Sequence, residues 1–564
     1  MTMDRSTILL VATFLVTVVL SSRTSHAEQN SFRGHVLVVF NSSNSESDTL
    51  AHYYGEKRHI PMDHILGVRT SDKEEISRDE FNDQIRDPID AYVVSKGWIQ
   101  REPGHSPFGD QQLPVLAARH NEIYIMVLMY GMPLKIANDP KINDTPVSNA
   151  ALNSNAASVD SELTLLPYQG LPVTGWLPNP YQLLSYNRPF DSLDAKHMIM
   201  VTRLDGPTTD DVRRMIDDSI YAERSRLAGN VYLDARGITD DSQKYYQGDR
   251  WLRDSVKTLR AVGFHTEIDE NTEVFPDSLP WTNVALYAGW FAGSATGPFM
   301  RESRTFSRGA IAYHIHDLSA STLRSATSNW CGPLISKGVA ATMGAVYEPY
   351  LDYMPQWDVF IDRLLHGYTF AEASYASTKA LSWMTVFVGD PLYSPFETSI
   401  DEAIASSPDK PSVRKDYLLI QRARAALIND DSGEAKNLVE KAVAGQNATF
   451  VAWEGYAEIM SDPRLEPPNS TVAKAYENAY NLSVNVEDQI RTGMEAATAY
   501  QARFRPQDSQ RILHMLLSRY TNQSIYYGVD KLLKQIQNSQ PSSAQQTESP
   551  SSGVDNPAVP PPTK

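Results

Sequence analysis

Short apolar runs alternate with amphipathic stretches over the first two thirds of the chain. The runs are almost continuously apolar, as in His35 to Phe40 and Glu122 to Tyr130, which is typical of strands covered on both faces. Strands that alternate with helices indicate an α/β fold, a mainly parallel sheet with helices on both faces. The predicted strands cover 35–40, 122–130, 197–202, 230–234, 284–288, 309–317 and 384–388, and the predicted helices cover 48–58, 81–95, 208–226, 249–261 and 338–344.

The periodicity changes after about residue 413. Apolar side chains now recur at helical spacing, as in Ala435, Leu438, Val439, Ala442 and Val443, and the helices fall into pairs. Pairs that repeat about every 34 residues are typical of tetratricopeptide-like hairpins, with an irregular helical bundle as the alternative. The predicted pairs are 416–427 with 435–443, 449–461 with 470–481, and 486–503 with 507–519, within a helical domain at 413–530.

The two ends of the chain differ from the rest. Arg5, the apolar run Ile8 to Leu20 and the small residues around Ala27 predict a signal peptide over 1–27, so we expect a secreted or periplasmic protein with no membrane span after cleavage. An uncleaved anchor is the alternative.

Residues 538–564 are rich in Ser, Gln and Pro and are expected to be disordered. The α/β domain then covers 32–400, with two subdomains and a boundary near 195–230 as one option.

Net charge and cysteine content exclude some classes of function. The net charge of −17 argues against binding nucleic acid or anionic lipid through a basic face. With one cysteine, the chain forms no internal disulfide. Cys331 begins a predicted helix, where it serves either as a small apolar residue or as a reactive thiol.

The strand at 309–317 ends in a cluster of titratable residues, and ligands gather beyond the carboxyl ends of parallel strands. His314 and His316 are two positions apart, so we expect both to point to one face, with Asp317 beside them. Such a pair could hold zinc with a third ligand. The alternative is that the histidines hydrogen-bond neighbouring loops, and no cofactor is otherwise expected. The candidate third ligands are Asp160, Glu162 and Glu348.

Other polar residues follow strands. Ser319 with His316 as base could be a nucleophile, although helix capping is the plainer interpretation. Arg203 could clamp a carboxylate or phosphate, or form an ion pair that organises its turn. Asp390 either binds a ligand or ties down the Gly389–Tyr393 turn. Trp290, which lies just after the predicted strand at 284–288, is a further candidate binding residue.

With these segments placed, the chain resembles an uncharacterised family of secreted bacterial proteins found in species with the exosortase, or PEP-CTERM, sorting system. The resemblance covers about 35–400 and implies export and a role in surface-protein or extracellular-matrix systems, without implying an activity. The motifs are Val36 to Asn41, Tyr53-Tyr54 to Ile60-Pro61, Tyr130 to Leu134, Arg203 to Pro207, Tyr313 to His316, Trp330 to Leu334, Glu348 to Leu351, Leu381 to Met384 and Gly389 to Tyr393.

More distantly, the order of segments is similar to that of the gingipain-type, caspase-like cysteine peptidases of clan CD. That resemblance implies a catalytic His after one strand and a catalytic Cys after the next. Here the two positions are Ala288-Gly289-Trp290 and His316-Asp317-Leu318-Ser319, so both catalytic residues are missing. Cys331 lies more than ten residues too late to substitute for the thiol.

The sequence therefore predicts a caspase-like α/β domain followed by tetratricopeptide-like helices. The leading hypothesis is a non-catalytic binding or scaffold protein that contacts a protein or extracellular polymer through its helical repeats. The alternative is a hydrolase or peptidase with a rebuilt site. Its candidate catalytic residues are His314, His316, Asp317 and Arg203, and its candidate binding residues are Trp290, Asp160, Glu348, Ser319 and Asp390.

Overall fold

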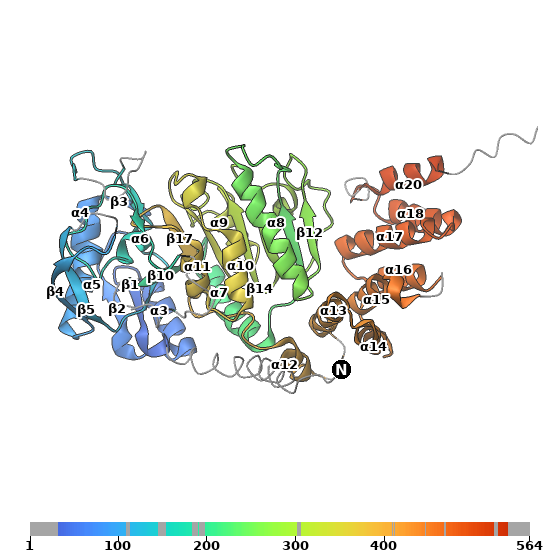
Figure 1. Ribbon diagram of the computed structural model, residues 1–564, viewed down its shortest axis with the longest axis horizontal. Helices are drawn as coiled ribbons and strands as arrows, with labels where there is room; N and C mark the ends of the chain where they lie inside the picture. Colours follow the sequence, from blue (N-terminus) through green and yellow to red (C-terminus); the bar gives the residue numbers. More distant parts are fainter. Residues whose placement is uncertain are drawn as a thin grey trace, which may run out of the picture.

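The computed structural model describes residues 32–108, 113–144, 154–182, 190, 198–301, 306–408, 410, 412–445, 447–466, 470–523 and 528–539. The signal peptide predicted at 1–27 and all but the first two residues of the predicted tail at 538–564 lie outside these residues. The described chain is a mixed α/β region followed by a helical region, as the sequence predicts (Figure 1).

The first sheet has six strands in the order β15-β17-β10-β6-β1-β2. Five of them are parallel, and β15 pairs antiparallel with β17. Val36 and Val38 pack into the core on one face, while Leu37 and Val39 pack into the core on the other. Both faces are thus covered, which explains the continuous apolar runs. The bounds are β1 (Val36–Asn41), β2 (Ile65–Val68), β6 (Ile125–Met129), β10 (Met200–Leu204), β15 (Thr342–Ala345) and β17 (Thr385–Val388).

The second sheet has four parallel strands in the order β12-β11-β13-β14. Its strand β14 meets β15 of the first sheet through a parallel bridge between Ile311 and Ala341. The Ala340 N–H donates to the Ala310 carbonyl (2.8 Å), and the Ala312 N–H donates to the Ala341 carbonyl (3.1 Å). The bounds are β11 (Asn230–Asp234), β12 (Thr266–Asp269), β13 (Val284–Trp290) and β14 (Phe306–Ile315).

This join fixes the relative direction of the two sheets. Because β15 runs parallel to β14 and antiparallel to β17, the strands of the second sheet run opposite to the parallel strands of the first. The carboxyl ends of β13, β14 and β15 therefore lie at one end of the strands, which we call the cavity edge. The carboxyl ends of β10 and β17 lie at the other end of the strands, which we call the opposite edge. Strand ends that look equivalent in the sequence therefore point in opposite directions.

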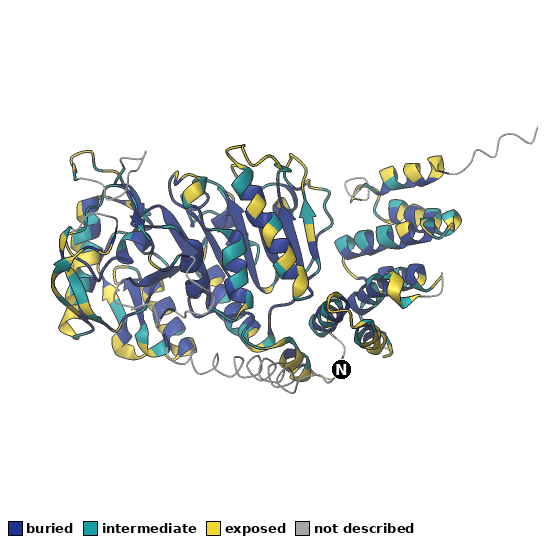
Figure 2. Ribbon diagram, in the orientation of Figure 1, coloured by how far each residue is buried: buried dark blue, intermediate teal, exposed yellow. Residues whose placement is uncertain are grey.

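Helices cover the sheets, and Figure 2 shows their buried faces turned toward the buried strands. Their first turns carry the expected caps: the Asn44 side chain accepts the N–H groups of Glu46 and Ser47, and Thr208 accepts that of Asp211. The bounds are α3 (Ser45–Arg58), α4 (Arg78–Phe81), a π-helical turn (Asn82–Arg86), α5 (Asp87–Ser95), α6 (Val159–Leu163), α7 (Thr209–Ser225), α8 (Tyr246–Ala261), α9 (Cys331–Ser336), α10 (Trp357–Leu365), α11 (Phe370–Ser377) and α12 (Ile400–Ala405).

The helix predicted over 338–344 is wrong. The helical turn ends earlier, at Ser336 of α9, and Thr342–Ala345 forms β15. Pairing with β17 overrides the helical pattern of small residues here. The remaining short strands are β3 (Glu75–Ile76), β4 (Ile99–His105), β5 (Pro114–Asn121), β7 (Lys135–Ile136), β8 (Ala157–Ser158), β9 (Leu177–Pro178) and β16 (Ala380–Leu381).

The helical region is a stack of antiparallel hairpins that begin at Val413, Phe450 and Val486. Its helices match the predicted pairs within a few residues at each boundary. The hairpins are α13 (Val413–Ile428) with α14 (Ser432–Val443), α15 (Phe450–Ile459) with α16 (Thr471–Leu482), and α17 (Val486–Gln501) with α18 (Pro506–Arg519), followed by α20 (Val529–Asn538).

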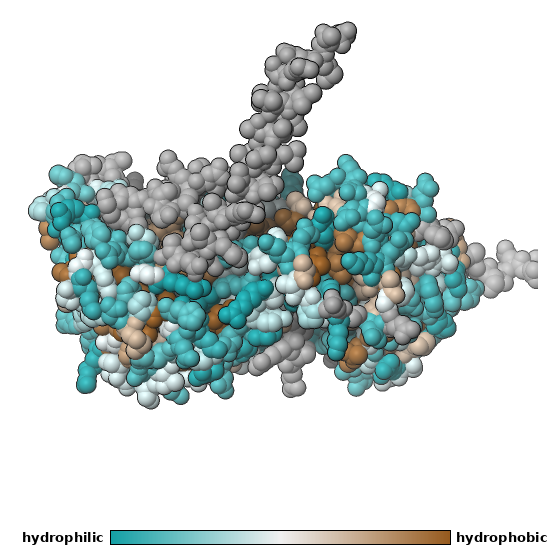
Figure 3. Space-filling view, turned by 90° about the horizontal axis from the view of Figure 1, so that it is seen from below, coloured by the Kyte–Doolittle hydropathy of each residue, from teal (hydrophilic) through white to brown (hydrophobic). Residues whose placement is uncertain are grey.

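The first helix of each hairpin faces the edge of the second sheet (Figure 1). On α13, the Gln421 amide donates to the Val262 carbonyl (3.0 Å). On α15, Glu458 lies 3.7 Å from His265. On α17, Asp488 accepts the Thr282 hydroxyl (2.6 Å). The array is therefore docked on the chain's own sheet. The exterior in Figure 3 is largely hydrophilic, with hydrophobic residues in scattered patches.

A substitution at Gly263 can test whether the helical array packs on the α/β region. Its φ is +84°, and a Cβ there would lie 1.9 Å from the Gln421 carbonyl oxygen of α13. Gly97 has a similar φ of +77° but open space around it. We expect Gly97→Ala to cost about 1 kcal/mol from backbone strain alone, and Gly263→Ala to cost about 2–4 kcal/mol because the clash adds to it. Urea unfolding measures both, and equal losses would contradict the docked arrangement.

Candidate functional site

A cavity of about 680 Å³ opens beyond the carboxyl ends of β13, β14 and β15. That size suits a small molecule or a few residues of a bound chain. Strand ends, the segment after β15 and the turn before α8 all contribute to its wall. The lining residues are Trp176, Lys244, Tyr245, Trp290, Phe291, Ile315, His316, Asp317, Glu348, Pro349, Tyr350, Leu351, Asp352, Tyr353 and Met354.

Aromatic rings dominate this wall. The rings of Tyr245, Trp290 and Phe291 contact one another, with centroids 5.5–6.0 Å apart. Trp176 packs on Tyr353 at 5.0 Å. Trp290 is fixed from behind, because its indole N–H donates to the buried carboxylate of Asp249 (2.6 Å). The rings thus form a preorganised apolar surface.

Two of the rings stand on unusual backbone. Phe291 has φ 146° and Tyr350 has φ 63°, and both side chains are exposed, at 55% and 43%. Leu318, just after β14, also has a positive φ of 55°. Non-glycine residues in this region are strained, and such strain is concentrated at functional sites. Here it aims large apolar side chains at the cavity rather than into the core.

The charged groups of the cavity form a short chain. His316 Nε2 lies 3.1 Å from Asp317 Oδ1, and His316 Nδ1 bonds the Asp317 carbonyl oxygen. Glu348 lies in the same wall, and its Oε1 accepts the Tyr350 N–H (3.0 Å). Partial burial and then the neighbouring Asp317 carboxyl group raise the pKa of Glu348 above its ordinary value.

His314 lies outside the cavity lining, in the core behind it. Its ring stacks on Trp330 with centroids 3.5 Å apart, its Nδ1 bonds the Tyr287 hydroxyl (2.8 Å), and its Nε2 accepts the Ala292 N–H (3.2 Å). Burial, followed by the charges of His316 and Arg236, lowers its pKa well below the usual value. His314 is a neutral packing residue with both ring nitrogens engaged.

These bonds bear on the predicted zinc site. Within the part of the chain that the structure describes, no group of three or more His, Cys, Asp or Glu side chains is arranged to hold a metal ion. A zinc ion on either ring nitrogen of His314 would have to displace the hydrogen bond that this nitrogen makes. Glu162, another predicted third ligand, pairs with Arg78 instead (2.8 Å).

Arg203 and Asp160 form a buried ion pair at the opposite edge of the sheet. The Arg203 guanidinium donates to both Asp160 oxygens, to Asp205 (3.2 Å) and to the Pro133 carbonyl (2.9 Å). Both side chains are buried, so neither faces a ligand. Of the two interpretations that the sequence allows for Arg203, the structure has the ion pair that organises the turn.

Asp390 is a structural residue at that same edge. Its carboxylate accepts the Tyr54 hydroxyl (2.8 Å), the Arg58 Nε–H (2.6 Å) and the Leu392 N–H (3.0 Å). The last of these bonds ties down its own turn, as the sequence suggests.

Ser319 and Cys331 lie side by side in the core. The Ser319 hydroxyl accepts the Ala345 N–H (3.1 Å), and the Cys331 thiol donates to the Met343 carbonyl (3.5 Å). Burial raises the pKa of Cys331 to about 12. A protonated, inaccessible thiol is not a nucleophile.

Of the nine predicted site residues, the structure brings four to the cavity: Trp290, His316, Asp317 and Glu348. Sequence reasoning missed most of the aromatic wall. The sequence did contain a sign of this wall, because Tyr350 and Tyr353 follow Glu348 within six residues, directly after a strand. No sequence pattern links Phe291 with Tyr245, since these two residues come together only through the tertiary fold.

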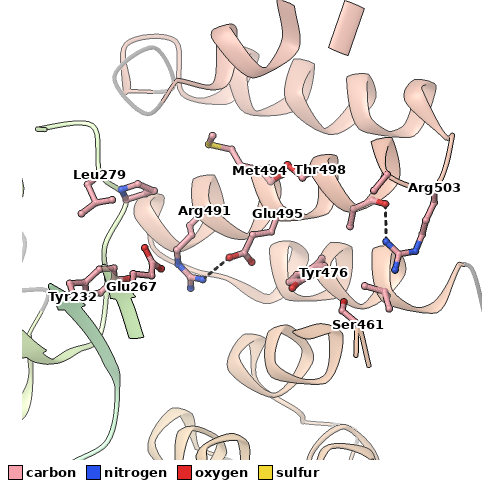
Figure 4. Close-up of a pocket in the computed structure, with 14 residues that line it drawn as sticks. Tyr232, Glu267, Leu279, Ser461, Tyr476, Arg491, Met494, Glu495, Thr498 and Arg503 are labelled. Carbon is pink, nitrogen blue, oxygen red and sulfur yellow. Dashed lines mark hydrogen bonds and ion pairs between the residues drawn. The ribbon is translucent and has the colours of Figure 1, made fainter. Parts of the chain in front are cut away.

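A second cavity, of about 490 Å³, separates the helical array from the sheet (Figure 4). Arg491, at its centre, contacts the carboxyl groups of Glu454, Asp488 (3.2 Å) and Glu495 (3.4 Å). Burial and the nearby Glu454 raise the pKa of Glu495 to about 8. These charges hold the interface together, so we assign the candidate site to the aromatic cavity.

Comparisons with known proteins give little support for an identity. No family model matches the chain, and no curated protein matches it. A chain of a solved structure named "Structure of Protease" aligns with 64% of this chain and 78% of its own length, at 9% identity and a TM-score of 0.30. That score is too low to carry an argument. The resemblances to the exosortase-associated family and to gingipains stay predictions.

Neutral His314 predicts a pH dependence of stability. An unfolded histidine takes up a proton below about pH 6.5, whereas folded His314 stays neutral, so the folded state loses stability as the pH falls. We expect a contribution of about 1.4 kcal/mol per pH unit below that point. Urea unfolding of wild type and His314→Asn at several pH values measures it. Identical slopes for the two proteins would contradict a neutral His314.

Because Cys331 is buried, we expect its thiol to be unreactive in the folded protein. We expect iodoacetamide to leave the folded protein unmodified at neutral pH and to alkylate Cys331 fully in urea, because the thiolate forms only after unfolding. Intact-mass spectrometry distinguishes the two. Rapid alkylation of the folded chain would overturn the placement of this thiol.

Proposed function

We propose that this chain is an exported binding protein that takes a segment of another protein into the aromatic cavity. The observation that carries the proposal is the wall itself, with six aromatic rings around a carboxyl pair at the carboxyl ends of parallel strands. Exposed aromatic rings held in place by the backbone supply large contact area at low entropic cost.

The lining favours a peptide over a sugar. Ile315, Pro349, Leu351 and Met354 add aliphatic surface to the rings, which suits an apolar side chain. A sugar would present hydroxyl groups to most of this wall and leave them unpaired. Asp317, Glu348 and Asp352 outnumber Lys244, so the cavity suits neutral or basic segments and repels acidic ones.

Recognition fits the site better than covalent catalysis. Among the described residues that line the cavity there is no serine, threonine or cysteine. Ser319 and Cys331 are buried and hydrogen-bonded elsewhere. A gingipain-type mechanism needs a thiolate with a base, and these groups supply neither.

The sequence suggests that the helical repeats bind a partner, but in this proposal their first helices serve the chain itself. These helices contact the second sheet and the loops beside it, so they support the α/β region. A partner of the array would then bind through its second helices, α14, α16 and α18. Among the helices of the described ranges, none has the length and apolarity to cross a membrane. Export is proposed from the predicted signal peptide.

Phe291 and Phe504 give a matched pair for testing the binding site. Both are exposed phenylalanines with positive φ, but Phe291 lines the cavity and Phe504 lies at the turn after α17. We expect a peptide selected from a random peptide library on the full chain to bind Phe291→Ala at least about ten-fold more weakly, because a large apolar contact is lost. Phe504→Ala should bind as wild type does.

Fluorescence of the cavity tryptophans provides the titration signal. If no peptide is selected, or if both variants bind equally well, the cavity is not the recognition site. Selection of neutral oligosaccharides in place of peptides would also overturn the proposed class of ligand.

A further inference from the structure

The aromatic cavity combines ring surface with hydrogen-bond donors that have no partner. Among the described residues, the hydroxyl groups of Tyr245, Tyr350 and Tyr353 make no hydrogen bond, although all three side chains line the cavity. Tyr245 and Tyr350 are also among the exposed rings, at 38% and 43%. A ligand that suits this wall therefore presents apolar rings or methylene groups together with free carbonyl oxygens.

A proline-rich segment in the polyproline II conformation has this chemistry. Its backbone makes no internal hydrogen bonds, so its carbonyl oxygens are free to accept them, and its pyrrolidine rings are apolar. Grooves lined by aromatic side chains bind such segments, because the ligand is already extended and loses little conformational entropy. Prolines three positions apart lie on the same face of the polyproline II helix, about 9 Å from each other.

The chain itself contains such a segment. Residues 556–564 are Asn-Pro-Ala-Val-Pro-Pro-Pro-Thr-Lys, so Pro557 and Pro560 are three positions apart. They follow the Pro-x-x-Pro spacing that aromatic grooves recognise.

The charges of this segment and of the cavity are complementary. The segment has one basic side chain, Lys564, and no acidic side chain. The cavity has the opposite balance, with Asp317, Glu348 and Asp352 against Lys244. A neutral proline stretch followed by a lysine therefore meets the requirement for a neutral or basic ligand.

We propose that the aromatic cavity binds proline-rich segments in the polyproline II conformation, and that residues 557–562 of the same chain are its resident occupant. This rests on the proposed function, because a peptide must fit the wall. Proline-rich segments of other proteins then compete with the chain's own segment, so the chain regulates access to its own site.

The link to the segment is long enough for this contact. The described chain continues to Ser539, just after α20, and about 20 residues separate Ser539 from Pro560. A link of that length spans up to about 70 Å when extended. A compact chain of about 500 residues has a radius of gyration of about 23 Å, which corresponds to a sphere about 60 Å across. A tethered segment reaches about millimolar effective concentration, so a weak affinity is sufficient for occupancy.

The first test measures competition in the full chain. A tail variant with Pro560→Ser, Pro561→Ser and Pro562→Ser keeps the length and charge of the tail and loses the proline spacing. We expect it to bind the peptide selected from the random library at least about three-fold more tightly than wild type, because the resident segment no longer competes. A control with Pro541→Ser and Pro550→Ser should bind as wild type does.

The second test supplies the segment as a separate molecule. A synthetic peptide of residues 556–564 should bind the tail variant and change its tryptophan fluorescence, and the same peptide with serine at every proline position should not. Adding Phe291→Ala to the tail variant should weaken binding of the synthetic peptide at least about ten-fold, whereas adding Phe504→Ala should leave it unchanged.

The tyrosine hydroxyls have their own readout. Combining Tyr245→Phe, Tyr350→Phe and Tyr353→Phe in the tail variant keeps all three rings, and it should weaken binding of the synthetic peptide at least about ten-fold. Urea unfolding should stay unchanged, because these hydroxyls have no partner in the free protein. An unchanged affinity would overturn the recognition of backbone carbonyl groups by this wall.

The outcomes separate this inference from the proposed function. If library peptides bind wild type and the tail variant equally well, the resident occupant is overturned and the binding function stands. If suppression by the tail grows with protein concentration, the segment enters a neighbouring copy, which overturns the contact within one chain. If library peptides bind but the synthetic peptide does not, the ligand class is overturned. If no peptide binds either protein, the binding function itself fails.

Discussion

The edge-to-edge join of β14 with β15 determines where chemistry can occur in this molecule. Three backbone hydrogen bonds hold it, between Ala310 or Ala312 on one side and Ala340 or Ala341 on the other, around the bridge from Ile311 to Ala341. Because the join sets the second sheet against the direction of the first, it gathers the ends of β13, β14 and β15 at one edge. The aromatic cavity follows from that gathering.

At the opposite edge, the polar residues that follow the strands are buried and form ion pairs with each other. Arg203 with Asp160 and Arg58 with Asp390 are fully desolvated, so each charge needs its partner in place. Removing one partner would leave a buried charge alone, which explains why such residues stand out in the sequence although they contact no ligand. At the cavity, by contrast, Asp317 is 31% exposed and Glu348 is exposed, so water can solvate both carboxyl groups.

The sequence predicted many of the elements, although it missed β2, β12, α10 and α11, and it did not predict the direction of the strands. Continuous apolar runs identified β1, β6, β10, β11, β13, β14 and β17, and helical spacing identified the hairpins, because both are local properties. The strand β15 was mistaken for a helix, since its pairing with β17 is long-range. That error hid the reversal of the second sheet, and with it the separation of Arg203 and Asp390 from His316. The two histidines show a similar limit. Alternation placed them on one face, but it could not show that Trp330 and Tyr287 enclose His314 alone.

Strain at the cavity edge bears on what the site is for. A protein that used this edge only for packing would gain stability by relaxing Phe291 and Tyr350 to ordinary backbone and burying their rings. Instead the fold holds both residues in positive φ and half exposed, in the wall that also carries Asp317 and Glu348. Two strained residues at one place, at strand ends that the fold brings together, are hard to explain by stability. They are what a preorganised binding site requires.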